Sequence, residues 1–150
     1  MSRYVVDASV AIKWYLPEIH DAAARRLLIE GHTLLALDLL FSEGGNILWK
    51  RVRSGELSAV EAETILKSLG GLGLSIFASW PLVLLALDIA VQTQRTVYDS
   101  LYLALAIREQ AILVTADSRF YHALETTPLA PHLLWVEDTP KEGPVEPTAH

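Results

Sequence analysis

Four acidic side chains in this sequence have the type and spacing to bind a divalent metal ion. They come from stretches far apart in the chain: Asp7, Glu43, Asp99 and Asp117. Oxygen ligands of this kind suit hard ions such as Mg²⁺ or Mn²⁺. Gathered without a cation, the same groups would repel one another and raise each other's pKa values. The four can act together only if the fold brings them to one place.

The elements around these acids alternate between strands and helices. Short apolar runs predict strands over residues 2–6, 33–37, 74–78, 111–114 and 133–136. Helices are expected over residues 8–16, 20–31, 38–53, 58–69, 81–93, 98–109 and 118–124, with Asp38 or Ser42 capping the third and a Ser58–Glu61 capping box opening the fourth. Uniformly apolar strands between helices are typical of a parallel sheet. The fold class is therefore α/β, with a central parallel sheet of about five strands flanked by helices on both faces.

Sheet geometry places the four acids near a common edge. Asp7 follows the first strand and Asp117 follows the fourth, and parallel sheets bind ligands beyond the carboxyl ends of their strands. Glu43 and Asp99 fall early in helices that begin near that edge, where the helix dipole favours a carboxylate. A single Asp after a strand is more often a helix cap or turn residue. Spacing alone therefore leaves the metal pocket and the cap interpretation open.

The length and composition of the chain predict one domain. Its 150 residues are enough for a domain over residues 1–137, followed by a disordered tail over 138–150 that is rich in proline and charge. No cysteine is present, which excludes disulfides and thiolate metal sites. The hydrophobic fraction of 51% and the mean hydropathy of +0.30 indicate a well-filled core or an apolar face for a partner. Trp14, Trp49 and Trp80 are among the candidates for that face.

Neither the net charge nor the apolar runs decide the function class. The formal charge is −6, but residues 137–150 contribute −3, and the other 136 residues reach +1 once the four candidate ligands are set aside. Residues 68–87 form an uncharged stretch of membrane-span length, but glycines, serines and Pro81 divide it into turn, strand and helix. We therefore expect no membrane span. The N-terminus does not have the pattern of a signal peptide, so a cytoplasmic location is expected.

Several motifs occur in a fixed order along the chain. They are YVVDASVAIKW at 4–14, LPE at 16–18, Glu43 followed by Asn46, Leu48 and Arg51, YDSLYLALA at 98–106, and LVTADSRF at 113–120. Together they resemble the motifs of PIN-domain proteins of the VapC toxin type over residues 4–120. One departure is the pair Gly44-Gly45 after Glu43. Two glycines cost a helix about 1 kcal/mol each relative to alanine, so we expect them to loosen the turn that carries Glu43.

The resemblance implies a metal-dependent ribonuclease, usually the toxin of a toxin–antitoxin pair and usually a homodimer. It implies an Mg²⁺ or Mn²⁺ cofactor, an RNA substrate and a small antitoxin protein as partner. Carried over by position, the catalytic and metal-binding set is Asp7, Glu43, Asp99 and Asp117, with Ser9 and Thr115 as hydroxyl neighbours. Asp7 is expected to be the ligand shared between ions, and Glu43 a ligand or a base that orients water. Spacing places Asn46 and Lys50 on the same helical face as Glu43, near the path of a phosphate.

Two other functions compete with this interpretation. A PIN-like domain could act as a partner-binding module with little or no nuclease activity, which predicts no metal-dependent turnover. An aspartyl-phosphate receiver or phosphotransferase-like domain also places an Asp after a parallel strand, and it predicts covalent phosphorylation of Asp7. Such sites usually use a second acid beside the nucleophile and a lysine at the sheet edge. The segment Asp7-Ala8-Ser9 lacks that acid, and no lysine occurs between Lys67 and Lys141.

Overall fold

The computed structural model describes residues 2–29 and 31–141. Five strands form one parallel sheet in the order β3-β2-β1-β4-β5, which confirms the predicted fold class. The strands are β1 (Ser2–Val6), β2 (His32–Leu37), β3 (Ser75–Phe77), β4 (Ile112–Thr115) and β5 (Leu133–Trp135). Receiver-like domains have the order 2-1-3-4-5, so the strand order here differs from theirs.

Strand β1 lies at the centre of the sheet, between β2 and β4. Val5 is in register with Leu35 of β2 and with Leu113 of β4. From β1 the chain proceeds to β2 and β3 on one side, whereas β4 and β5 lie on the other. The strand order therefore reverses between β1 and β4, and the crevice at the carboxyl ends of these two strands is the expected ligand position.

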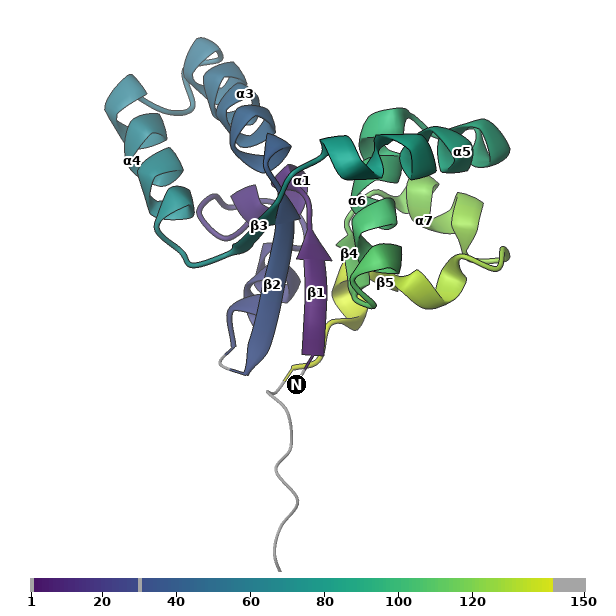
Figure 1. Ribbon diagram of the computed structural model, residues 1–150. Helices are drawn as coiled ribbons and strands as arrows, with labels where there is room; N and C mark the ends of the chain where they lie inside the picture. The colour runs from purple at the N-terminus through teal and green to yellow at the C-terminus, as the bar shows by residue number, and fades with distance from the viewer. Residues whose placement is uncertain (1, 30, 142–150) are drawn as a thin grey trace, which may run out of the picture.

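Helices cover both faces of the sheet (Figure 1). One face carries α1 (Ala8–Ile12), α2 (Asp21–Arg25), α3 (Leu39–Arg53) and α4 (Ala59–Gly70). The other carries α5 (Val83–Thr93), α6 (Val97–Arg108) and α7 (Ser118–Leu124). Short 3₁₀ turns lie at Arg26–Leu28, Trp80–Leu82, Ala130–His132 and Val136–Asp138. Because each face has its own layer of helices, strand residues of both orientations, such as Val5 and Val6, are fully buried.

Two helices are shorter than the sequence predicts. Helix α1 ends at Ile12 rather than Leu16, because Lys13, Trp14 and Tyr15 donate to the carbonyl three residues back and tighten the chain into turns before Pro17. Helix α2 ends at Arg25 and continues only as a 3₁₀ turn to Leu28. The uncharged stretch 68–87 divides as predicted into the end of α4, β3, a 3₁₀ turn and the start of α5. Within the described residues, no helix is both long and apolar enough to cross a membrane.

The packed chain extends past the predicted domain boundary at residue 137. Asp138 belongs to a 3₁₀ turn and Thr139 is 2% exposed. The Arg26 guanidinium donates to the carbonyl oxygens of Glu137 and Thr139, at 3.2 Å each. Packed contacts therefore continue to Thr139, two residues into the predicted tail. Residues 142–150 of the predicted tail lie outside the described residues.

Candidate metal and nuclease site

A small cavity opens where the carboxyl ends of β1 and β4 meet. Its volume is about 70 Å³. Its polar lining comes from Asp7, Ser9, Asp99, Tyr102, Thr115 and Asp117. Three of the four predicted acids therefore line one cavity, at the position where the strand order reverses.

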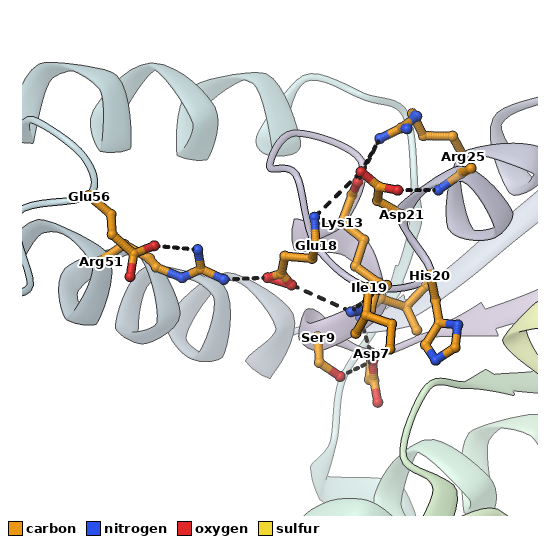
Figure 2. Close-up of polar contacts among 12 residues, drawn as sticks. Asp7, Ser9, Lys13, Glu18, Ile19, His20, Asp21, Arg25, Arg51 and Glu56 are labelled. Carbon is orange, nitrogen blue, oxygen red and sulfur yellow. Dashed lines mark hydrogen bonds and ion pairs between the residues drawn. The ribbon is translucent and has the colours of Figure 1, made fainter.

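Asp7 is the first residue after β1 and the N-cap of α1. Its Oδ1 accepts hydrogen bonds from the Val10 backbone N–H at 2.9 Å and from Ser9 Oγ at 3.0 Å, the second of which can be followed in Figure 2. These bonds fix one carboxylate oxygen. Asp7 thus caps a helix and lines the cavity at the same time.

Asp117 repeats this arrangement on the neighbouring strand. It is the N-cap of α7, and its Oδ1 accepts from the backbone N–H groups of Arg119 at 3.0 Å and Phe120 at 3.1 Å. Its own N–H donates to Thr115 Oγ1 at 3.1 Å. Thr115 therefore holds the backbone of the residue that carries the acid.

Asp99 reaches the cavity from the first turn of α6. The N-cap of this helix is Thr96, whose hydroxyl accepts from the Asp99 N–H at 3.1 Å. Asp99 is thus not itself the cap, and its position three residues after Thr96 places the carboxylate near the positive end of the helix dipole. As whole residues, Asp99 and Asp117 are exposed and Asp7 is partly buried, but the Asp99 carboxylate is enclosed enough for burial to raise its pKa.

Glu43 lies beside the cavity rather than among its lining residues. Its Oε1 accepts a 2.6 Å hydrogen bond from the hydroxyl of Tyr102, which does line the cavity. Helix α3 runs unbroken through Gly44 and Gly45, so the expected loosening of this turn is wrong. The reason is packing: a Cβ on Gly44 would lie 3.6 Å from Leu69 Cδ2, so the backbone is held closely against α4.

The acids of the site disfavour one another's charged forms. Burial is the main cause of the raised pKa of Asp7, and repulsion from Asp99 and Asp117 adds to it. Burial also raises the pKa of Glu43 and of Asp99, with further contributions from Asp7 and Asp99 at Glu43 and from Asp117 at Asp99. Arg95 acts in the opposite direction at Asp99. In the described part of the chain, no cation contributes to the pKa of Asp7 or Glu43.

The donor chemistry of the site fits a hard divalent cation. All the acidic ligand candidates offer carboxylate oxygen, and a cation among them would offset the repulsion that raises their pKa values. Among the described residues, no three acidic, His or Cys side chains are already gathered into a metal-coordinating group. Carboxylates that repel one another are expected to stand apart in this way. Asp7, Asp99 and Asp117 are the residues that would hold the ion, with Glu43 beside them.

The other predicted contacts lie along α3. Asn46 and Lys50 are exposed one and two turns beyond Glu43 and do not line the cavity, so their role toward a phosphate stays a prediction. Arg51 turns away from the cavity and pairs with Glu18 at 2.8 Å and Glu56 at 2.6 Å (Figure 2). Its pairing ties α3 to the loop that follows α1.

Tyr102 is the residue of the site that the motif analysis overlooked as a functional group. Its spacing of three residues from Asp99 is a usable signal, because residues three apart share a helical face. A single tyrosine on an apolar helix is ordinary core material, however. Its partner Glu43 lies 59 residues away in sequence, so only the packed structure shows the contact.

Comparison with known proteins identifies the family of this chain. The PIN domain matches residues 4–124. Ribonuclease VapC3 from Pyrobaculum aerophilum is 34% identical over 117 residues, which cover 77% of this chain and 89% of that protein. The chain therefore belongs to the PIN-domain family, and among its members it is similar to VapC3.

Solved structures share the fold. The crystal structure of PAE2754 from Pyrobaculum aerophilum has a TM-score of 0.65 and 28% identity, covering 81% of this chain and 79% of that one. A toxin–antitoxin complex from Klebsiella pneumoniae has a TM-score of 0.61 at 10% identity, covering 89% and 97%. VapBC2 from Rickettsia felis, bound to a DNA fragment from its promoter, has a TM-score of 0.62 at 16% identity, covering 88% and 97%. The last two show similarity of fold alone.

Proposed function

We propose that this protein is a metal-dependent endoribonuclease and the toxin of a toxin–antitoxin pair. The observation that carries the proposal is the convergence of Asp7, Asp99 and Asp117 on one cavity at the β1–β4 switch point. The similarity to a VapC ribonuclease supports RNA as the substrate. A module that only binds partners would have no need of carboxylates that raise one another's pKa at a ligand-binding edge.

The chemistry that Mg²⁺ or Mn²⁺ supplies when bound is activation of water and neutralisation of charge that develops on phosphate oxygens. Asp7, Asp99 and Asp117 are the residues that would hold the cation with their carboxylate oxygens. Glu43 would orient the attacking water or accept its proton. Ser9 keeps the Asp7 carboxylate in place through its 3.0 Å hydrogen bond, and Thr115 does the same for the Asp117 backbone.

Lys50 and Asn46 extend this site for a long substrate. Both are exposed on the face of α3 that carries Glu43. An ammonium group there attracts the RNA backbone beside the cleaved bond. Arg51 is already paired with two glutamates, so it is a poorer candidate for this contact.

An apolar groove between α3 and α4 is the proposed binding place of a small antitoxin. Its volume is about 310 Å³, and its apolar lining includes Leu48, Trp49, Val52, Ala62 and Leu66. Trp49 is 53% exposed and continues the apolar surface of this groove. An amphipathic antitoxin helix would cover this surface.

The exposed apolar face of α5 is the proposed homodimer contact. Leu84, Leu87 and Val91 follow one another at helical spacing and are 81%, 49% and 72% exposed. Trp80, in the turn before α5, is 80% exposed. A second copy that covers this face removes a contiguous apolar surface from water.

The nuclease proposal is tested by incubating the protein with a panel of RNAs in Mg²⁺, in Mn²⁺ and in EDTA. We expect cleavage by the wild type in at least one metal, none in EDTA, and none by Asp7→Asn in any condition. Equal cleavage by both proteins would contradict the proposal. So would the absence of cleavage by the wild type in every metal.

A further inference from the structure

The hydrogen bond between Tyr102 and Glu43 connects the two halves of the site. Tyr102 belongs to α6 on one face of the sheet and Glu43 to α3 on the other. The bond is 2.6 Å long, slightly shorter than the commonest O–H···O distance and within the range of bonds to a charged acceptor. Tyr102 is 3% exposed and packs in the core of the α5–α7 face. The buried side chain of Tyr102 therefore holds the partly buried side chain of Glu43.

The direction of this bond follows from the chemistry of the two groups. A phenol O–H donates and a carboxylate oxygen accepts, so Tyr102 is the donor and Glu43 Oε1 the acceptor. The bond occupies Glu43 Oε1 and thereby fixes the orientation of the carboxylate.

Helical spacing couples this contact to the metal-binding acids. Tyr102 follows Asp99 by three residues, so both project from one face of α6 and both line the cavity. Glu43 does not line the cavity itself. Its link to the cavity is the hydrogen bond from the Tyr102 hydroxyl. Without that bond, the glutamate side chain would have several rotatable bonds and many accessible rotamers.

We propose that Tyr102 is a positioning residue for cleavage, whose hydroxyl holds the Glu43 carboxylate at the edge of the acidic cavity. This inference rests on the proposed nuclease function and adds a residue that acts through Glu43 rather than on the substrate. A hydrogen-bond partner that orients a carboxylate at a metal site affects metal affinity or activity by about 10- to 100-fold in many enzymes, so we expect an effect of about that size.

The test is a double-mutant cycle of Tyr102→Phe and Glu43→Gln. Phenylalanine keeps the buried ring and removes only the hydroxyl. We expect Tyr102→Phe to lower kcat by about 10- to 100-fold while KM for RNA stays within about twofold. In the Glu43→Gln background, the same change should have no further effect, because the group that the hydroxyl positions has already lost its function.

Tyr4→Phe is the matched control. Tyr4 is 5% exposed and packs edge-on against His32 toward the start of the sheet. Its variant therefore also loses a phenolic hydroxyl from the core, but away from the cavity. We expect wild-type kcat for this variant. A second readout is Mn²⁺ binding by calorimetry without RNA, in which Tyr102→Phe should weaken binding by about tenfold and Tyr4→Phe should not.

The outcomes separate this inference from the function on which it rests. If the wild type cleaves RNA and Tyr102→Phe matches it in kcat and Mn²⁺ affinity, the positioning role is refuted while the nuclease function stands. A further large loss in the Glu43→Gln background would also refute it, because Tyr102 would then act by another route. If the wild type cleaves no RNA, the nuclease function fails, and unchanged Mn²⁺ affinity in Tyr102→Phe would overturn the positioning role independently.

Discussion

Asp7 has two roles in this structure, and two substitutions separate them. As a cap, it accepts hydrogen bonds from Val10 N–H at 2.9 Å and Ser9 Oγ at 3.0 Å. As a partly buried acid, it has a pKa that is raised by burial and by the charges of Asp99 and Asp117. Asp7→Asn removes the charge and keeps an acceptor oxygen, whereas Asp7→Ala removes both.

The size and sign of each effect follow from these contacts. Loss of an N-cap acceptor costs about 1 kcal/mol. The free energy of unfolding of Asp7→Ala should therefore be lower than that of Asp7→Asn by about this amount. In a chain of this size, that is a difference in Tm of about 2–4 °C. A raised pKa means that the folded state binds the proton more tightly than the unfolded state, so metal-free stability falls as pH rises through that pKa. Above it, Asp7→Asn should be at least as stable as the wild type.

Thermal unfolding in EDTA near pH 7.5 measures both effects. Ser58→Ala serves as the calibration, since Ser58 Oγ accepts from Glu61 N–H at 3.0 Å in the α4 capping box, away from the cavity. It should lose about 1 kcal/mol and keep full RNA cleavage, while both Asp7 variants lose cleavage. If Asp7→Asn were as unstable as Asp7→Ala, the separation of cap and charge would be refuted.

Four further predictions follow from the same structure. Gly44→Ala should raise the free energy of unfolding in urea by about 0.5–1 kcal/mol, because its Cβ would meet Leu69 at an ordinary contact distance of 3.6 Å; a loss of stability would contradict this packing. Lys50→Ala should raise KM for RNA several-fold without changing Mn²⁺ affinity in calorimetry, and an unchanged KM would remove Lys50 from the substrate path. Mn²⁺ affinity of the wild type should fall from pH 7.5 to pH 5.5, because protons compete most strongly for carboxyls with raised pKa values; a flat profile would argue against carboxylate ligands. Leu84→Glu should convert a dimer to a monomer in light scattering, whereas a dimer that persists would place the contact elsewhere.

The sequence was sufficient for the fold class and for the local cap that opens α4. Uniformly apolar strands between helices predicted the parallel sheet, and Ser58 with Glu61 predicted a capping box whose two hydrogen bonds are both present. These features depend on residues close together in the chain. The structure therefore confirms them with little change.

The sequence was less informative where distant residues meet. Cap and ligand seemed to be competing roles for an Asp after a strand, yet Asp7 and Asp117 cap helices and line the cavity together. Asp38 takes the N-cap position of α3 but makes no capping hydrogen bond with its side chain. Arg26 donates a hydrogen bond to the carbonyl oxygen of Thr139, 113 residues later in the chain. Such contacts depend on tertiary packing, which local patterns do not encode.

The most direct test of the central claim is Mn²⁺ binding measured by electron paramagnetic resonance. The comparison includes the wild type, Asp7→Asn, Asp99→Asn and Asp117→Asn, with Asp88→Asn as the control. Asp88 is an exposed acid on α5 that does not line the cavity. Its carboxylate accepts a hydrogen bond from the side-chain amide of Gln92. We predict that each cavity variant binds Mn²⁺ at least about tenfold more weakly than the wild type, while Asp88→Asn binds as the wild type does. Equal binding by all five proteins would contradict the claim that these carboxylates form one metal site.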